Sequence, residues 1–270
     1  MPNHAIGVFD SGLGGLTVMK EIVNALPKED IVYFGDTGRV PYGTRSRETI
    51  RKYAKEDAKF LLSHSVKAIV AACGTVSAVA ADTAEDLPVP FFEMITPAVK
   101  AAVKKTKNNK IGIIGTPATV KSGEHKKRIL ELLPDAEIYA VPCPLFVPLV
   151  EEGLTSPDNL IVFETAKKYL ASLKEKGIDT LILGCTHYPL LSEVISLVLG
   201  KDVALINPAT ELSRILKDYL VDNKLINSNG GEHNYYVSDM TASFKNTAQN
   251  LIGEEIDENN AKQVDITKYE

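Results

Sequence analysis

The sequence predicts an α/β protein with two similar parallel-sheet domains, related by a pseudo-twofold axis and holding the active site in the cleft between them. Short apolar runs that end in Gly or small polar residues alternate with segments of helical periodicity, as in parallel strands joined by helical crossovers. Landmarks of the first half recur at offsets of 105 (111 − 6), 106 (139 − 33) and 112 (185 − 73), which indicates two similar halves. The paired landmarks are Ile6 and Ile111, Tyr33 and Tyr139, and Cys73 and Cys185.

Composition and charge narrow the class of protein. The chain has 270 residues, of which 44% are apolar and 24% charged, as in an ordinary globular protein. The net charge of −5 gives no reason to expect nucleic acid or an anionic membrane as a partner. Apolar runs are too short for a transmembrane helix, and the N-terminus does not resemble a signal peptide, so we expect a cytoplasmic protein. Cysteine and histidine spacing predicts neither a disulfide framework nor a metal site.

The first predicted strand, 6–10, ends at Asp10 and runs into a Gly-rich turn. A helix over 16–26 follows, and Pro27 ends it. The turn does not match a dinucleotide-binding or Walker motif, because Thr17 replaces the third Gly and no Gly-Lys-Ser/Thr follows. The free N–H groups of the helix start can cradle a carboxylate. Strands disfavour Asp, so Asp10 is either a turn former for this helix or a carboxylate in the cleft.

The second predicted strand, 31–36, also ends in an acid, Asp36. A loop with two Gly and one Pro follows over 37–43. Ser46 is expected to cap a helix that continues to about His64, because apolar residues recur there at helical spacing.

Two later strands end in a cysteine followed by hydroxyl-bearing residues. One apolar run leads into Cys73-Gly74-Thr75, and another, over 181–184, leads into Cys185-Thr186-His187. Carboxyl ends of parallel strands form the sheet edge where α/β proteins bind ligands. We therefore expect both cysteines at the cleft, although a single buried Cys is more often a small core residue.

Strands near 110–116 and 138–139 begin the second half of the pattern. A helix over 210–222, a strand over 235–237 and a helix over 244–251 are expected to complete the first domain.

We predict that 1–96 and 208–270 form the first domain and that 97–207 form the second. Within the second, Glu151 and Glu152 lie either on a solvated helix face or at the cleft.

Two thiols on opposite sides of a cleft suit one reaction in particular. One thiolate removes a proton from one face of a carbon atom, and the other thiol delivers a proton to the opposite face. A thiolate exists at neutral pH only when neighbours lower the thiol pKa, and Asp10, Asp36 and His187 are candidates to assist. Hydroxyls that can hold a substrate carboxylate belong to Ser11, Thr75 and Thr186.

Four segments resemble the glutamate racemases of the aspartate/glutamate racemase superfamily. They are IGVFDSGLGGLTV at 6–18, YFGDTGRVPYG at 33–43, ACGTVSA at 72–78 and GCTHYPLL at 184–191. The resemblance covers nearly the whole chain. It implies a cofactor-independent two-base racemase that interconverts L- and D-glutamate without pyridoxal phosphate. It also implies a homodimer in the bacterial cytoplasm that supplies D-glutamate for peptidoglycan.

The same resemblance assigns roles to individual residues. Cys73 and Cys185 would face opposite sides of the substrate Cα, and Asp10 and His187 would assist proton transfer or orient the substrate ammonium group. The remaining residues implied at the substrate pocket are Ser11, Pro41, Tyr42, Gly43, Gly74, Thr75 and Thr186. Asp36 and Glu151 are further candidate acids at the cleft.

Gly74 departs from the family pattern, which usually has Asn at this position. We expect Gly74 to leave space and to remove a hydrogen bond worth about 1.5–3 kcal/mol, which would change substrate affinity or selectivity. Two alternatives therefore stay open. The protein is a racemase of another small amino acid such as aspartate, or a redox-sensing binding protein in which Cys73 and Cys185 form a disulfide.

Overall fold

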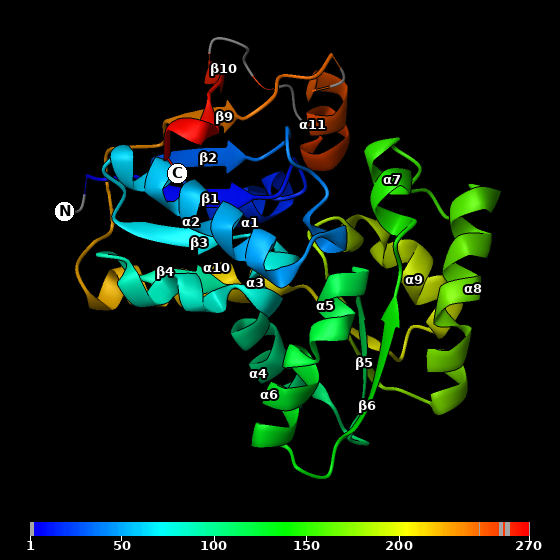
Figure 1. Cartoon of the computed structure of the whole chain (residues 1–270). Helices are drawn as coiled ribbons and strands as arrows, with labels where there is room; N and C mark the ends of the chain where they lie inside the picture. Colours follow the sequence, from blue (N-terminus) through cyan, green and yellow to red (C-terminus); the bar gives the residue numbers. More distant parts are fainter. Residues whose placement is uncertain (1–2, 243, 254–255, 257–259, 270) are drawn as a thin grey trace.

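The structure is a computed structural model that describes residues 3–242, 244–253, 256 and 260–269. It contains two sheets with helices on both sides (Figure 1). The first sheet has six strands in the order β10-β9-β2-β1-β3-β4, and the second has four in the order β6-β5-β7-β8. All strand pairs in the described part of the chain are parallel, which confirms the predicted fold class of two parallel-sheet α/β domains.

The first sheet combines the N-terminal and C-terminal parts of the chain. In Figure 1 the orange β9 lies beside the blue β2, and the red β10 lies on the other side of β9. Its strands are β1 (Ile6–Asp10), β2 (Ile31–Gly35), β3 (Ala68–Ala71), β4 (Phe91–Glu93), β9 (His233–Val237) and β10 (Ala261–Gln263). The helices between and after them are α1 (Leu16–Ala25), η1 (Tyr42–Thr44), α2 (Arg47–Ser63), α3 (Gly74–Val79), η2 (Ala81–Asp86), α4 (Ile95–Lys105), α10 (Pro208–Asp222), α11 (Phe244–Ile252) and η5 (Ile266–Tyr269).

The second sheet is formed by one continuous stretch of chain. Its strands are β5 (Lys110–Gly115), β6 (Glu137–Pro142), β7 (Thr180–Gly184) and β8 (Ala204–Ile206). Its helices are α5 (Pro117–Ser122), α6 (Glu124–Leu132), α7 (Phe146–Glu151), α8 (Leu160–Lys176), η3 (Tyr188–Leu191) and α9 (Ser192–Leu199). The order β6-β5-β7-β8 repeats the order β2-β1-β3-β4, so β3 and β7, which precede the two cysteines, occupy corresponding places.

The two sheets agree with the predicted division of the chain, but the boundaries themselves stay a prediction. Strands of the first sheet lie within 6–93 and 233–263, and those of the second within 110–206. The predicted boundaries at 96/97 and 207/208 fall between these ranges. Positions 1–2 and 270, which begin and end the predicted first domain, lie outside the described residues. The pseudo-twofold axis also stays a prediction.

Local sequence signals explain where the long helices begin. The Ser46 hydroxyl accepts a hydrogen bond from the Thr49 N–H and starts α2, as predicted. Asn207 caps α10 by accepting from the Ala209 N–H, and Pro208 stands at the first turn, where its missing N–H costs no hydrogen bond. Strands β1, β2 and β7 are buried along their whole length, which is why they read as continuous apolar runs.

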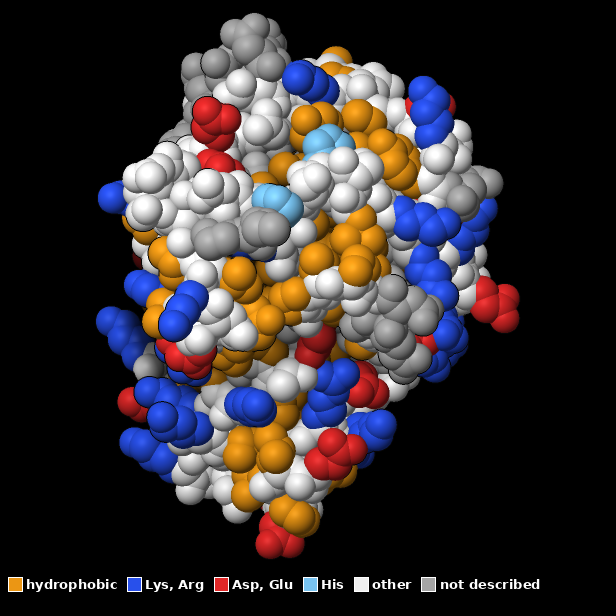
Figure 2. Space-filling view, turned by 90° about the vertical axis from the view of Figure 1, so that its left-hand side faces the viewer, with side chains coloured by type: hydrophobic (Ala, Val, Ile, Leu, Met, Phe, Trp, Pro, Cys, Tyr) orange, Lys and Arg blue, Asp and Glu red, His pale blue; other side chains and the backbone are white. Residues whose placement is uncertain are grey.

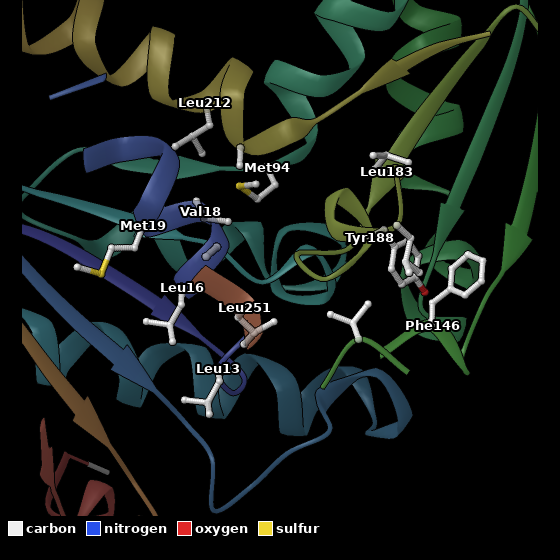
Figure 3. Packing of buried hydrophobic residues seen from close by; sticks show 14 of the residues in the cluster. Leu13, Leu16, Val18, Met19, Met94, Phe146, Leu183, Tyr188, Leu212 and Leu251 are labelled. Atoms are coloured by element: carbon white, nitrogen blue, oxygen red, sulfur yellow. The ribbon is translucent and has the colours of Figure 1, made fainter. Parts of the chain in front are cut away.

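One hydrophobic cluster runs through both halves of the molecule. It joins Leu16 and Met19 of α1 to Leu212 of α10, and it continues to Phe146 and Tyr188 beside the second sheet (Figure 3). The two sheets therefore share a core. Their relative position is fixed by packing as well as by the two places where the chain crosses between them.

The outer surface carries charges of both signs. On the face in Figure 2, hydrophobic side chains lie in broken groups, and Lys, Arg, Asp and Glu lie around them. In the part of the chain that the structure describes, none of the helices has the length and apolar character needed to cross a membrane.

Leu212 provides a test of the shared core. Replacing this fully buried side chain by Ala is expected to lower the free energy of unfolding by about 2–5 kcal/mol, because a cavity is left in the cluster. Val221→Ala on the same helix is the control, since Val221 is 54% exposed and its truncation is expected to change stability by less than about 0.5 kcal/mol. Urea denaturation measures both. Equal, small effects would contradict a core that depends on α10.

Candidate active site

A cavity of about 330 Å³ lies where the carboxyl ends of strands from both sheets meet. Loops after β1, β2 and β3 form one side, and loops after β5, β6 and β7 form the other. This volume suits a small ligand. The cavity is lined by twelve of the thirteen predicted site residues: Asp10, Ser11, Pro41, Tyr42, Gly43, Cys73, Gly74, Thr75, Glu151, Cys185, Thr186 and His187.

Asp36 is the thirteenth, and it does not line the cavity, contrary to the expectation of a cleft acid. Its carboxylate is fully buried and accepts hydrogen bonds from Arg39, Tyr42 and Ser238. The position of Asp36 at the strand end was predicted correctly. Its hydrogen bonds to Arg39, Tyr42 and Ser238 hold the side chain away from the cleft. Glu151 reaches the cavity, whereas its neighbour Glu152 is exposed and does not.

Cys73 lies at the start of α3, directly after β3, and is 5% exposed. Its Sγ donates to the Ser11 hydroxyl at 3.6 Å. Burial and the neighbouring Asp10 carboxylate raise the pKa of this thiol to about 12. Cys73 is therefore a protonated thiol at neutral pH, able to donate a proton into the cavity.

Cys185 follows β7 and lies in a different electrostatic environment. Its Sγ is 3.8 Å from His187 Nδ1, and the opposite ring nitrogen, Nε2, is 3.1 Å from Glu151 Oε1. Burial lowers the pKa of His187, but the hydrogen bonds to Cys185 and Glu151 outweigh it and raise the pKa to about 10. His187 is thus an imidazolium at neutral pH, and its charge favours a negatively charged sulfur beside it. Both cysteines are free.

Asp10 serves both of the roles considered for it. Its Oδ2 accepts from the Gly12 and Gly15 N–H groups at 3.2 and 3.0 Å, which shapes the turn before α1. Its Oδ1 is buried and has no hydrogen-bond partner in the described part of the chain. Burial raises the Asp10 pKa, and the His187 charge and the turn N–H groups oppose that rise. An oxygen of this kind favours a bound hydrogen-bond donor.

Hydroxyl groups connect the two sides of the cavity. The Thr75 and Thr116 hydroxyls share a hydrogen bond of 3.1 Å, and the Thr17 hydroxyl donates to the Thr186 carbonyl at 2.7 Å. Thr116 lines the cavity but was missed in the sequence. The repeat offset could have found it, because 11 + 105 = 116 places Thr116 opposite Ser11.

Eight further residues that line the cavity were also missed in the sequence, and they contribute mainly to its shape. They are Gly12, Val40, Thr44, Pro117, Pro144, Val147, Pro148 and Gly184. Most are apolar, and an apolar residue in a loop has no sequence signal that separates a cavity wall from ordinary packing.

Gly74 does not leave the open space that was expected. A Cβ at this position would lie 2.6 Å from the Gly184 carbonyl oxygen of the opposite half. Gly14 has a similar place, since a Cβ there would lie 2.3 Å from His187 Cε1. The missing side chains let the second half approach the backbone of the first half, through the Gly184 carbonyl at Gly74 and through the Thr186 and His187 side chains at Gly14.

Comparison with known proteins agrees with this fold. Residues 6–215 match the family described as Asp/Glu/Hydantoin racemase. The chain therefore belongs to the Asp/Glu/hydantoin racemase family. Racemases are isomerases.

Within that family the chain falls with the glutamate racemases, which confirms the resemblance found in the sequence. It is 46% identical to the glutamate racemase of Geobacter metallireducens over 94% of each chain, and 46% identical to that of Thermoanaerobacter pseudethanolicus over the whole of both. The crystal structure of glutamate racemase from Francisella tularensis in complex with D-glutamate superposes with a TM-score of 0.92, at 42% identity and full coverage of both chains.

Gly74 gives a test of the close approach. Gly74→Ala in a helix without a nearby obstacle is expected to stabilise a protein by about 0.4–1 kcal/mol. Here we expect the opposite sign, a loss of about 1–3 kcal/mol, because the new Cβ meets a backbone carbonyl.

Gly74→Asn is the matched variant, since it adds the amide that the family pattern carries. Both variants are expected to be destabilised in urea denaturation. A stabilised Ala variant would contradict the contact between the two backbones.

Proposed function

We propose that this protein is a cofactor-independent glutamate racemase that interconverts L- and D-glutamate by a two-base mechanism. The observation that carries the proposal is that Cys73 and Cys185, at the ends of the corresponding strands β3 and β7, line one cavity. The named activity of the full-length relatives supports glutamate as the substrate.

The unlike environments of the two sulfurs suggest how a turnover begins. The Cys185 sulfur, next to the His187 imidazolium, removes the α-proton as a thiolate: the Cα–H bond breaks and an S–H bond forms. The Cys73 thiol then gives its proton to the opposite face of Cα and becomes a thiolate. Racemisation in the other direction uses the same steps in reverse, so the two protonation states are exchanged rather than consumed.

The remaining cavity groups suit an amino acid. The unpartnered Asp10 Oδ1 would accept a hydrogen bond from the substrate ammonium group and so orient it. The positive charge of that ammonium group makes the α-proton more acidic. The hydroxyls of Ser11, Thr75, Thr116 and Thr186 would donate to its carboxylates, and Pro41 and Gly43 would form the wall beside them. No Lys or Arg side chain lines the cavity among the described residues, so hydroxyl and backbone N–H donors would carry this binding.

The wider role follows from the same proposal. D-Glutamate made by this enzyme would serve peptidoglycan synthesis in a bacterial cytoplasm, and the enzyme would act as a homodimer. These statements rest on the family resemblance.

Removal of either thiol tests the mechanism. Cys73→Ala and Cys185→Ala are each expected to lower racemisation by at least about 10³-fold, because each removes a proton-transfer group. Cys143→Ala is the control, since this buried thiol does not line the cavity. Proton NMR of L- and D-glutamate in D₂O, without added cofactor, followed by chiral analysis, measures the reaction. Full turnover by either cavity variant would rule out two bases.

The Glu151–His187 contact predicts a pH effect. His187 is charged below its pKa of about 10 and loses that charge as the pH rises through this value. Glu151→Gln removes one of the groups that raises the pKa, so the alkaline fall in kcat/KM is expected to begin at lower pH.

Glu152→Gln is the control for this profile, because Glu152 carries the same charge on the exposed neighbouring position. Its pH profile is expected to match that of the wild type. An unshifted profile for Glu151→Gln would mean that Glu151 does not control His187.

A further inference from the structure

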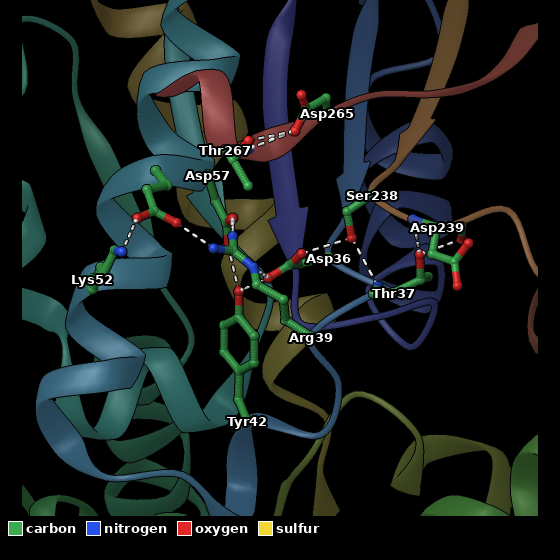
Figure 4. A network of polar contacts seen from close by, with 12 residues as sticks. Asp36, Thr37, Arg39, Tyr42, Lys52, Asp57, Ser238, Asp239, Asp265 and Thr267 are labelled. Atoms are coloured by element: carbon green, nitrogen blue, oxygen red, sulfur yellow. Dashed lines mark hydrogen bonds and ion pairs between the residues drawn. The ribbon is translucent and has the colours of Figure 1, made fainter. Parts of the chain in front are cut away.

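A buried network of charged and polar side chains lies behind the cavity wall formed by 40–44 (Figure 4). Arg39 lies at its centre. The guanidinium donates to Asp36 Oδ2 at 2.6 Å, to Asp57 Oδ1 at 3.2 Å, and also to Glu56. It also lies over the Tyr53 ring, 3.9 Å from the centroid.

The network joins three separate parts of the chain. Asp36 and Arg39 belong to the loop after β2, and Glu56 and Asp57 belong to α2. Ser238, just after β9, donates to Asp36 Oδ1 at 2.7 Å and accepts from the Gly38 N–H at 2.8 Å. The loop is therefore held on both sides before its residues reach the cavity.

Tyr42 connects the network to the cavity. The residue lines the cavity but is 1% exposed, and its hydroxyl contacts Asp36 and lies 3.0 Å from Asp57 Oδ2. This hydroxyl is engaged behind the wall, so it is not a hydrogen-bond partner for a ligand. The predicted role of Tyr42 in substrate binding is thereby limited to its backbone and ring.

The Tyr42 hydroxyl links two acidic side chains of the network, Asp36 and Asp57. The Tyr42 hydroxyl has one proton but contacts two carboxyl groups. Burial raises the pKa of Asp57 well above its ordinary value, and the neighbouring Asp36 carboxylate raises it further. The Arg39 charge and the Tyr42 hydroxyl oppose this rise, and the Tyr42 hydroxyl is shared between Asp36 and Asp57. Arg39 faces all three acidic side chains, Asp36, Glu56 and Asp57, and the Lys52 ammonium lies 3.5 Å from Glu56.

We propose that Arg39 and the Tyr42 hydroxyl are positioning residues for the substrate: by holding the 40–44 wall they set the affinity of the cavity, not the rate of proton transfer. The proposal rests on the proposed racemase function for its substrate. Neither group touches the reacting sulfurs, and both act through the backbone of the wall. Their loss is expected to weaken substrate binding selectively.

Tyr42→Phe is the sharpest test, because it removes one oxygen and keeps the ring that lines the cavity. We expect KM for glutamate to rise about tenfold and kcat to stay within about twofold. Arg39→Lys, which keeps a charge but loses the guanidinium fork, is expected to act in the same direction. Tyr219→Phe and Arg51→Lys are the matched controls, since Tyr219 packs on Phe92 and Arg51 pairs with Asp82, which are not members of the network.

Asp57 provides a conservative rescue. Asp57→Asn keeps a hydrogen-bonding side chain of the same shape beside the Tyr42 hydroxyl, so its KM is expected to stay within about threefold of the wild type, whereas Asp57→Ala is expected to resemble Tyr42→Phe. If Asp57 acted only on the stability of the fold, KM would change in both Asp57 variants in step with their melting temperatures. Hydrogen exchange of the peptide spanning 36–45 adds a readout that needs no substrate, and it is expected to be faster in Tyr42→Phe than in Tyr219→Phe.

The outcomes separate this inference from the proposed function. A wild-type enzyme that racemises glutamate, with an unchanged KM in Tyr42→Phe, would overturn the positioning role, as would a loss confined to kcat. A wild-type protein inactive on glutamate would overturn the proposed function alone. The exchange of 36–45 would then decide the positioning role, and unchanged exchange in Tyr42→Phe would reject it.

Discussion

The geometry of the cavity depends on how closely the two halves of the molecule approach each other at Gly14 and Gly74. At Gly14 and Gly74, atoms of the second half occupy the space where a side chain would begin. Each position brings a functional group within reach: His187 lies against Gly14, and the strand end that carries Cys185 lies against Gly74. A Cβ at either position would separate the sheet edges and, with them, the two thiols. The shared hydrophobic cluster supports the same arrangement from the other side.

The two halves provide similar frames with unlike electrostatics. Corresponding strands place one cysteine on each side, but the first is buried beside a carboxylate and the second lies beside an imidazolium. The proposed two-base mechanism uses this difference, because the Cys73 thiol can donate a proton and the His187 charge stabilises a thiolate beside it. The shared strand order gives the two cysteines corresponding places, and the residues that differ between the halves give each cysteine its own surroundings.

Strand ends and cysteines could be predicted from the sequence because their signals are local. A buried parallel strand is a continuous apolar run, and the residue that follows it reaches the sheet edge whatever the rest of the chain does. The direction of Asp36 could not be predicted in this way, because its partner Ser238 is 202 positions away. The contact of Gly74 with Gly184 is equally remote in sequence. The edge strands β4 and β10, three residues each, are too short to show a period and were missed for that reason.

The return of the chain to the first sheet makes the cavity wall depend on a segment that is synthesised after both halves of the cleft. Strand β9 and Ser238 are made long after the loop that they hold. A ribosome-bound chain that has not yet emerged past this strand can already contain both cysteines and both halves of the cleft. It still lacks the Ser238 contacts to Asp36 and Gly38, so the wall is held on both sides only after Ser238 has emerged.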